Sequence, residues 1–204
     1  EADALACACA RMPATGAALA AVFAAVAEAL PDFAPRSLLD AGAGPGTASW
    51  MAQAAWPDLP RITMLDRNPA LRALARRLAD QGPSALARAD ILAGDLEQTE
   101  GPRADLPHAD MVVASYVLAE LPEDRAAAMA LGLWRAADSL LVLVEPGTPQ
   151  GFARIRAARA ALIAEGAHVA APCTHDADCP MPRSEGIGRS DKENKADDWC
   201  HFSR

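Results

Sequence analysis

The sequence predicts an α/β domain of the doubly wound type, with a mainly parallel sheet between two layers of helices. Three observations lead to this fold class. Short apolar runs alternate with helical patterns from residue 37 onward, and this alternation implies parallel strands joined by crossover helices. A glycine-rich turn follows the first apolar run, at Gly42, Gly44 and Gly46. The runs at 111–115 and 140–144 are apolar throughout, as expected of central strands buried on both faces.

The elements follow one another in a regular order. Residues 1–30 carry apolar residues at helical spacing, which predicts a helix. Pro13 interrupts this pattern early, so the helix is either continuous or divided into two segments at that residue. The expected strands lie at 37–41, 62–66, 88–92, 110–115 and 139–145, and the expected helices at 46–55, 69–80, 122–137 and 152–165. Residues 168–171 are a candidate sixth strand. The chain therefore divides into N-terminal helices (1–36), an α/β domain (37–170) and a Cys-rich segment (171–204).

Composition limits the classes of partner. The chain has 204 residues and a formal net charge of −8, which argues against a strong nonspecific grip on DNA or other nucleic acid. No apolar run reaches about 18 residues, so we expect no membrane partner. The sequence does not begin with Met and starts within an expected helix, which indicates a piece of a longer protein. Five cysteines without a secretory leader favour metal binding or free thiols over disulfides.

The glycine-rich turn indicates a nucleotide-like ligand. Glycine adopts positive φ and has no Cβ to keep a ligand away, and the helix that follows directs free N–H groups at this place. The dinucleotide fingerprint needs its third glycine at position 47, which is Thr47. An acidic strand end, Asp40, followed by Gly-x-Gly-x-Gly instead resembles the first motif of S-adenosylmethionine (SAM) methyltransferases. Asp66 ends the second strand, where a carboxylate accepts hydrogen bonds from ribose hydroxyls.

Further candidates lie at the carboxyl ends of the later strands, where open α/β sheets bind ligands. Asp95 follows the third strand and either accepts from an adenine amino group or caps a turn. Ser115 and Tyr116 follow the fourth strand, and Tyr116 either lines the pocket or is buried with its hydroxyl satisfied. Glu145 ends the fifth strand and either faces the ligand or supports the turn after it. The predicted cofactor-binding residues are Asp40, Gly42, Gly44, Gly46, Asp66, Asp95 and Ser115.

A second candidate site lies in the Cys-rich segment. Cys173, Cys179 and Cys200 stand beside Pro, His and Trp in a segment with too little apolar surface to fold alone. Thiolates bind zinc or iron–sulfur clusters, and the spacing matches no common zinc signature, which favours an iron–sulfur cluster. The alternative is three free thiols. A fourth ligand is His175, His201 or a further cysteine.

Together these motifs resemble one family, the mitochondrial small-ribosomal-subunit methyltransferase-like proteins and their bacterial relatives. The matching segments are residues 11–15, 38–50, 115–121, 143–149, 151–152, 171–180 and 198–203. The resemblance implies a class I SAM-binding domain, a role in small-subunit assembly, and Cys173, Cys179 and Cys200 as ligands of a four-iron (4Fe-4S) cluster. The family's fourth cysteine lies farther toward the C-terminus than this sequence extends, and residues 183–197 are longer than the family pattern. As a bacterial relative, the protein is expected in the cytoplasm.

Three functions compete at this point. The first is a SAM-dependent methyltransferase that acts on small-subunit ribosomal RNA. The second is a catalytically inactive assembly factor that keeps the SAM fold and carries an iron–sulfur cluster. It is favoured by the acidic balance and by residues 115–118, Ser-Tyr-Val-Leu, which stand where amine methyltransferases have Asn/Asp-Pro-Pro-Tyr. The third, a nicotinamide-dependent oxidoreductase, is the weakest, because Thr47 occupies the third-glycine position.

Overall fold

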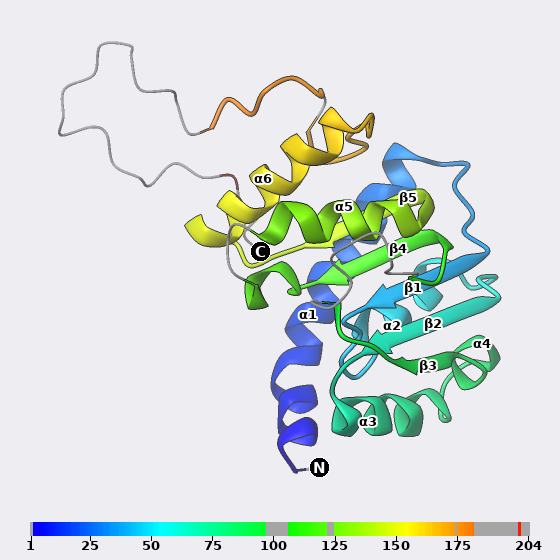
Figure 1. The fold of residues 1–204 in the computed structure, drawn as a ribbon. Coiled ribbons are helices and arrows are strands. Elements are labelled where there is room, and N and C mark those ends of the chain that lie inside the picture. Colours follow the sequence, from blue (N-terminus) through cyan, green and yellow to red (C-terminus); the bar gives the residue numbers. More distant parts are fainter. Residues whose placement is uncertain (1, 97–105, 122–124, 174, 182–199, 201–204) are drawn as a thin grey trace.

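The computed structural model describes residues 2–96, 106–121, 125–173, 175–181 and 200 (Figure 1). Five strands form one parallel sheet in the order β3-β2-β1-β4-β5. The strands are β1 (Ser37–Ala41), β2 (Arg61–Asp66), β3 (Asp90–Ala93), β4 (Ala109–Ser115) and β5 (Ala137–Val144). The helices are α1 (Ala2–Ala29), α2 (Thr47–Ala55), α3 (Pro69–Ala79), α4 (Ser84–Ala87), the 3-10 helix η2 (Leu118–Glu120), α5 (Ala126–Ala136) and α6 (Pro149–Ala164). The predicted doubly wound α/β class is confirmed.

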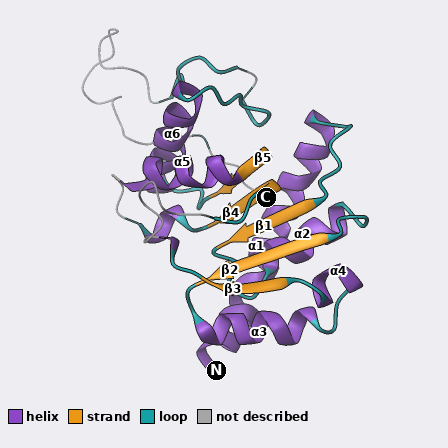
Figure 2. Cartoon of the chain, turned by 45° about the vertical axis from the view of Figure 1, so that its right-hand side comes forward, coloured by secondary structure: helices purple, strands orange, loops and turns teal. Residues whose placement is uncertain are grey.

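Helices cover both faces of the sheet (Figure 2). Alternate side chains of each strand point to opposite faces, and the two core clusters follow this alternation. Leu38 of β1 belongs to the cluster under α1, α2 and α4, together with Phe23 of α1. Leu39, one residue later, belongs to the cluster under α5 and α6, together with Leu133 of α5. The first helix therefore shares its core with the α/β domain, and the division at residues 36 and 170 remains a prediction.

The predicted strands lie within two residues of those observed, except for the candidate sixth strand. Residues 168–171 form no strand, so that prediction is wrong. The backbone N–H of Val169 donates to Asp176 Oδ1 at 2.8 Å instead of to a neighbouring strand. Asp176 also meets His168 Nδ1 at 2.7 Å, and this contact is the main cause that lowers the pKa of Asp176. A short polar loop thus replaces the strand.

Helix α1 is continuous through Pro13, so the expected division at that residue does not occur. A proline removes one backbone hydrogen bond, and apolar packing is present on both sides of it: Ala8 packs against Leu74 of α3, and Phe23 lies in the main core. The segment Ala4–Ala29 is long and apolar enough to span a membrane by length and composition, although buried core helices satisfy the same criterion.

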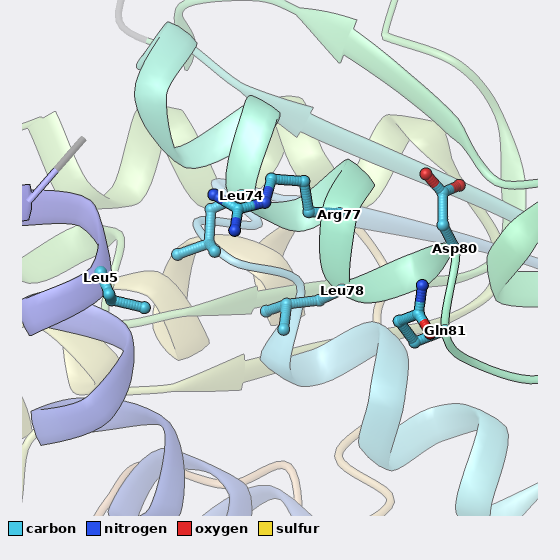
Figure 3. A pocket seen from close by; sticks show the side chains of 6 residues that line it. All are labelled: Leu5, Leu74, Arg77, Leu78, Asp80 and Gln81. Carbon is cyan, nitrogen blue, oxygen red and sulfur yellow. The ribbon is translucent and has the colours of Figure 1, made fainter.

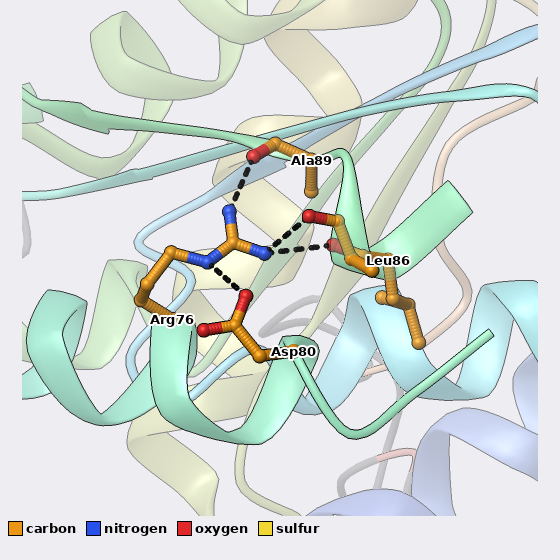
Figure 4. A network of polar contacts seen from close by, with 5 residues as sticks. Arg76, Asp80, Leu86 and Ala89 are labelled. Carbon is orange, nitrogen blue, oxygen red and sulfur yellow. Dashed lines mark hydrogen bonds and ion pairs between the residues drawn. The ribbon is translucent and has the colours of Figure 1, made fainter. Parts of the chain in front are cut away.

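One arginine fixes the connection from α3 into β3 (Figure 4). The Arg76 guanidinium donates to the carbonyl oxygens of Ala89, Leu86 and Ala87 at 3.0, 3.3 and 2.6 Å. Its Nε also donates to Asp80 Oδ1 at 2.8 Å. Charged donors form the stronger class of hydrogen bond, so Arg76 holds the short helix α4 at the entry of the edge strand.

Candidate functional site

All five strands are parallel, so their carboxyl ends meet at one edge of the sheet (Figure 1). The chain order reverses between β1 and β4, which lie side by side. In doubly wound sheets the ligand crevice lies at such a reversal, outside the carboxyl ends of the strands. The turn after β1 and the segment after β4 therefore border the candidate site.

The turn after β1 has a backbone that favours glycine at three positions. Gly42, Gly44 and Gly46 have φ values of 73°, 55° and 89°, in the region that other residues rarely adopt. An ideal Cβ on Gly44 would meet nothing within 4 Å, whereas one on Gly42 would lie 2.5 Å from Val117 Cγ2. The middle of the turn thus faces open space, while its first glycine is in close contact with the segment after β4. This arrangement fits a ligand that approaches the backbone at Gly44.

Asp66 joins this turn to the end of β2. Its Oδ2 accepts from the backbone N–H of Gly44 at 2.7 Å, and its Oδ1 accepts from the N–H of Asn68 at 2.7 Å. A carboxylate has about four acceptor positions, so both oxygens retain capacity for ligand hydroxyls. Asp66 is half-buried at the edge of the candidate crevice, where the sequence predicted a ribose acceptor.

Asp40 lies beneath the turn and is 1% exposed. Its Oδ2 accepts from the backbone N–H and the hydroxyl of Ser49 in α2, at 3.0 and 2.8 Å. Burial raises the pKa of Asp40 to about 6, against the lowering effect of the Ser49 hydrogen bonds. Both described contacts of this carboxyl lie within the protein, so Asp40 fixes α2 relative to β1. Its predicted contact with a ligand remains a prediction.

Asp95 follows β3 and Ser115 ends β4, so the two residues lie on opposite sides of β2 and β1 at the carboxyl edge of the sheet. Arg67 lies 4.0 Å from Asp95 and 3.6 Å from Glu120, and thereby links the segments that follow β2, β3 and β4. Ser115 ends β4 and pairs with Val144. The structure brings both predicted residues to the same edge as the glycine turn, and their roles toward a ligand remain predictions.

Sequence reasoning missed how the segment 116–121 is held. Tyr116 has a φ of 61°, which is unusual for a residue other than glycine. It packs against the core beneath α2, and its N–H donates to the Val144 carbonyl at 2.7 Å. Glu145 Oε1 accepts from the Leu118 N–H at 2.7 Å. Glu145 therefore supports this segment, and its predicted roles toward a ligand or the following turn remain predictions. The sequence carries no pattern that pairs these two residues.

The predicted metal ligands are not brought together among the residues that the structure describes, where no three His, Cys, Asp or Glu side chains form a possible metal group. Cys173 and Cys179 are half-buried and Cys200 is exposed. The loop that carries the first two is fixed to α6, since Arg159 donates to the carbonyls of His175 and Ala177 at 2.6 and 2.9 Å. Residues 182–199 and His201 lie outside the described part.

A pocket of about 400 Å³ lies elsewhere, between α1 and α3 (Figure 3). Leu5, Leu74 and Leu78 form its apolar walls, and Arg77, Asp80 and Gln81 form its polar ones. None of the predicted site residues lines this pocket.

Comparisons with known proteins place this geometry in context. The model of the family described as mitochondrial small ribosomal subunit Rsm22 matches residues 1–204. The human ribosome assembly protein METTL17, mitochondrial, is 32% identical over 164 residues, which are 74% of this chain and 35% of that protein. The Rsm22-cox11 tandem protein 2, mitochondrial, of Schizosaccharomyces pombe is 26% identical over 163 residues, 74% of this chain and 21% of that protein. The chain thus spans about a third or less of these relatives.

Two solved structures share the fold. Magnesium protoporphyrin IX methyltransferase from Synechocystis PCC 6803, solved with bound SAM, has a TM-score of 0.50 and 25% identity over 63% of this chain and 57% of that chain. A putative O-methyltransferase from Nostoc punctiforme PCC 73102 has a TM-score of 0.53 at 17% identity, over 67% and 39%. The class I SAM methyltransferase fold is therefore confirmed.

The expected location is corrected by the same comparisons. The family description names mitochondria, and so do the names of the human and fission yeast relatives. The expectation of a bacterial cytoplasmic protein is wrong. It followed from the bacterial side of the resemblance.

The close approach at Gly42 gives a stability prediction. Gly42→Ala introduces both an unfavourable positive φ and a contact with Val117, and we expect it to lower the free energy of unfolding by about 2–4 kcal/mol. Gly44→Ala meets open space and should cost about 1–2 kcal/mol. Gly132→Ala in α5, also with open space, should stabilise by about 0.5–1 kcal/mol. Urea unfolding measures all three, and equal effects at positions 42 and 132 would contradict the turn geometry.

Burial of Asp40 predicts a pH-dependent stability. Its pKa rises from 3.8 to about 6 on folding, so the folded protein holds this proton more tightly than the unfolded chain. The contribution of Asp40 is complete below about pH 4 and is lost as the pH rises to about 6, by on the order of 3 kcal/mol. Urea unfolding at several pH values should show a steeper loss of stability between about pH 4 and pH 6 in the wild type than in Asp40→Asn. The control Asp58→Asn, at an exposed residue, should retain it. Equal slopes in wild type and Asp40→Asn would refute the assignment.

Proposed function

Because the chain belongs to the family described as mitochondrial small ribosomal subunit Rsm22, we propose that it binds SAM at the glycine turn and acts on the small ribosomal subunit during its assembly. The observation that carries the proposal is the turn itself. Three positive-φ glycines at a topological switch point leave the backbone at Gly44 open, and the Asp66 carboxylate stands beside it. The methyltransferase fold and the names of the relatives support the choice of ligand and partner.

Each residue of the site has a place in this proposal. The Asp66 carboxylate accepts from the ribose hydroxyls, and Asp95 accepts from the adenine amino group. Gly42, Gly44 and Gly46 let the amino-acid part of the ligand approach the backbone, and Ser115 lines the side next to β4. Asp40 acts from beneath through Ser49, by fixing the start of α2. Bound SAM would supply an activated methyl group, so the chain's own contribution is to orient it and exclude water.

We further propose that the chain transfers the methyl group of SAM to small-subunit ribosomal RNA. The sulfonium already activates the methyl group, so positioning supplies much of the rate and a strong general base is not essential. The alternative is an assembly factor that keeps the fold and the ligand without chemistry. One specific observation favours it: the human relative is named as a ribosome assembly protein.

The Cys-rich segment is proposed to hold an iron–sulfur cluster through Cys173, Cys179 and Cys200. Thiolates are the ligands that such clusters use, and the Arg159 contacts give the loop of the first two cysteines a defined place on α6. The described residues do not assemble the site, so the proposal rests on the sequence pattern and the family resemblance.

Binding of SAM is the first test. Isothermal calorimetry should detect the binding of SAM but not of NAD. The variant Asp66→Asn should bind SAM about 10- to 100-fold more weakly, because hydrogen bonds to a charged acceptor are lost. Asp58→Asn, at an exposed residue remote from the turn, should leave the affinity unchanged. Binding of NAD in place of SAM, or equal affinities for both variants, would count against the proposal.

A methyl-transfer assay then separates the enzyme from the inactive assembly factor. Immature small ribosomal subunits are incubated with SAM that carries a tritiated methyl group, and the RNA is isolated. The enzyme proposal expects label in the RNA with the wild type and a large loss with Asp66→Asn. If SAM binds but the RNA carries no label above background, methyl transfer is refuted and only the assembly role remains.

Replacement of the cysteines tests the cluster. Protein purified without air should contain iron and acid-labile sulfide, and Cys173→Ser, Cys179→Ser and Cys200→Ser should each lower both contents. Cys9→Ser is the matched control, at an exposed cysteine of α1, and should retain them. Wild-type protein free of iron and sulfide would remove the cluster from the account.

A further inference from the structure

The segment 116–121 is held at several points after it leaves β4. Its first residue, Tyr116, has a strained backbone of the kind that persists only where the surroundings fix it. Its last residue, Leu121, has its carbonyl bonded by Arg154 of α6 at 3.2 Å. Between them, Glu145 Oε1 accepts from the Leu118 N–H at 2.7 Å. Glu145 therefore ties the middle of this segment to the end of β5.

The position of this segment matters at the glycine turn. Val117 lies between Tyr116 and Leu118, and its Cγ2 would be 2.5 Å from a Cβ at Gly42. The side chain thus lies directly against the backbone of the turn. Because Val117 directly precedes Leu118, we expect a displacement of the Leu118 N–H from Glu145 to move Val117 relative to Gly42. The carboxyl group of Glu145 is in this way connected to the ligand-binding backbone through two neighbouring residues.

We propose that Glu145 is a positioning residue for ligand binding at the glycine turn, and that the loss of its proton strengthens its hold on the segment 116–121. This inference rests on the proposed binding of SAM. An ionised carboxylate forms a stronger hydrogen bond with a backbone N–H than a neutral carboxyl group does. The ionised form therefore keeps Val117 against Gly42, and the neutral form lets the segment loosen.

Glu145 is balanced between its two protonation states by its surroundings. Its Oε2 is buried and has no hydrogen-bond partner among the described residues, a situation that disfavours the charge. Glu120 of η2 also disfavours it, whereas the N–H groups of Leu118 and Ala119 and the Arg154 guanidinium favour it. Burial is the largest of these effects, and it raises the pKa of Glu145 to about 7. The group therefore changes charge near neutral pH.

The test compares wild type with Glu145→Gln, which keeps an acceptor for the Leu118 N–H but cannot ionise. The affinity for S-adenosylhomocysteine is measured by calorimetry at about pH 6 and about pH 8. We expect the ratio of wild-type to Glu145→Gln affinity to rise by about fivefold between them. Because both proteins bind the same ligand, its own titration cancels in the ratio. Glu165→Gln, at an exposed residue after α6, should follow the wild type.

A second measurement does not depend on the ligand. The amide resonance of Leu118 in the free protein should titrate with a midpoint at about pH 7 in the wild type and lose this titration in Glu145→Gln. A Leu118 amide that does not titrate overturns the inference even if SAM binds. A titrating amide with a constant affinity ratio also overturns it, because the hold would then not reach the ligand. If no adenosyl ligand binds, the proposed function fails and the inference that rests on it is overturned.

Discussion

The site depends on one backbone constraint, the left-handed turn between β1 and α2. Three residues with positive φ carry the chain from the centre of the sheet into a helix. Two carboxylates stabilise this turn and the helix that follows it. Asp66 fixes the turn from the side through the Gly44 N–H, and Asp40 fixes α2 from beneath through Ser49. The position of β1 between β2 and β4 then places both neighbouring strand ends against this turn.

The acidic groups of the site differ because their surroundings differ. Asp40 is fully buried on the α2 side of the sheet, so its charge is costly and its pKa rises. Asp66, at the open edge, accepts two backbone N–H groups and retains acceptor capacity. Glu145 lies between these extremes, with one oxygen bonded and the other buried without a partner among the described residues. The same chemical group therefore serves support, ligand contact and positioning in our account.

The sequence was sufficient for the features that depend on local pattern. The apolar runs located all five strands, and the glycine spacing located the turn. It was insufficient where a distant partner decides the outcome. Val169 looked like part of a strand, but Asp176 takes its N–H. Pro13 looked like a break, but packing on both sides keeps α1 continuous. Asp40 binds Ser49 within the protein, and its contact with a ligand remains a prediction.

A structure of the protein in complex with S-adenosylhomocysteine tests the central claim most directly. Our account predicts the ribose hydroxyls within hydrogen-bond distance of both Asp66 oxygens and the ligand against the open backbone at Gly44, with Val117 still in contact with Gly42. A ligand located in the pocket between α1 and α3, or a turn whose open side is filled by protein side chains, would contradict it.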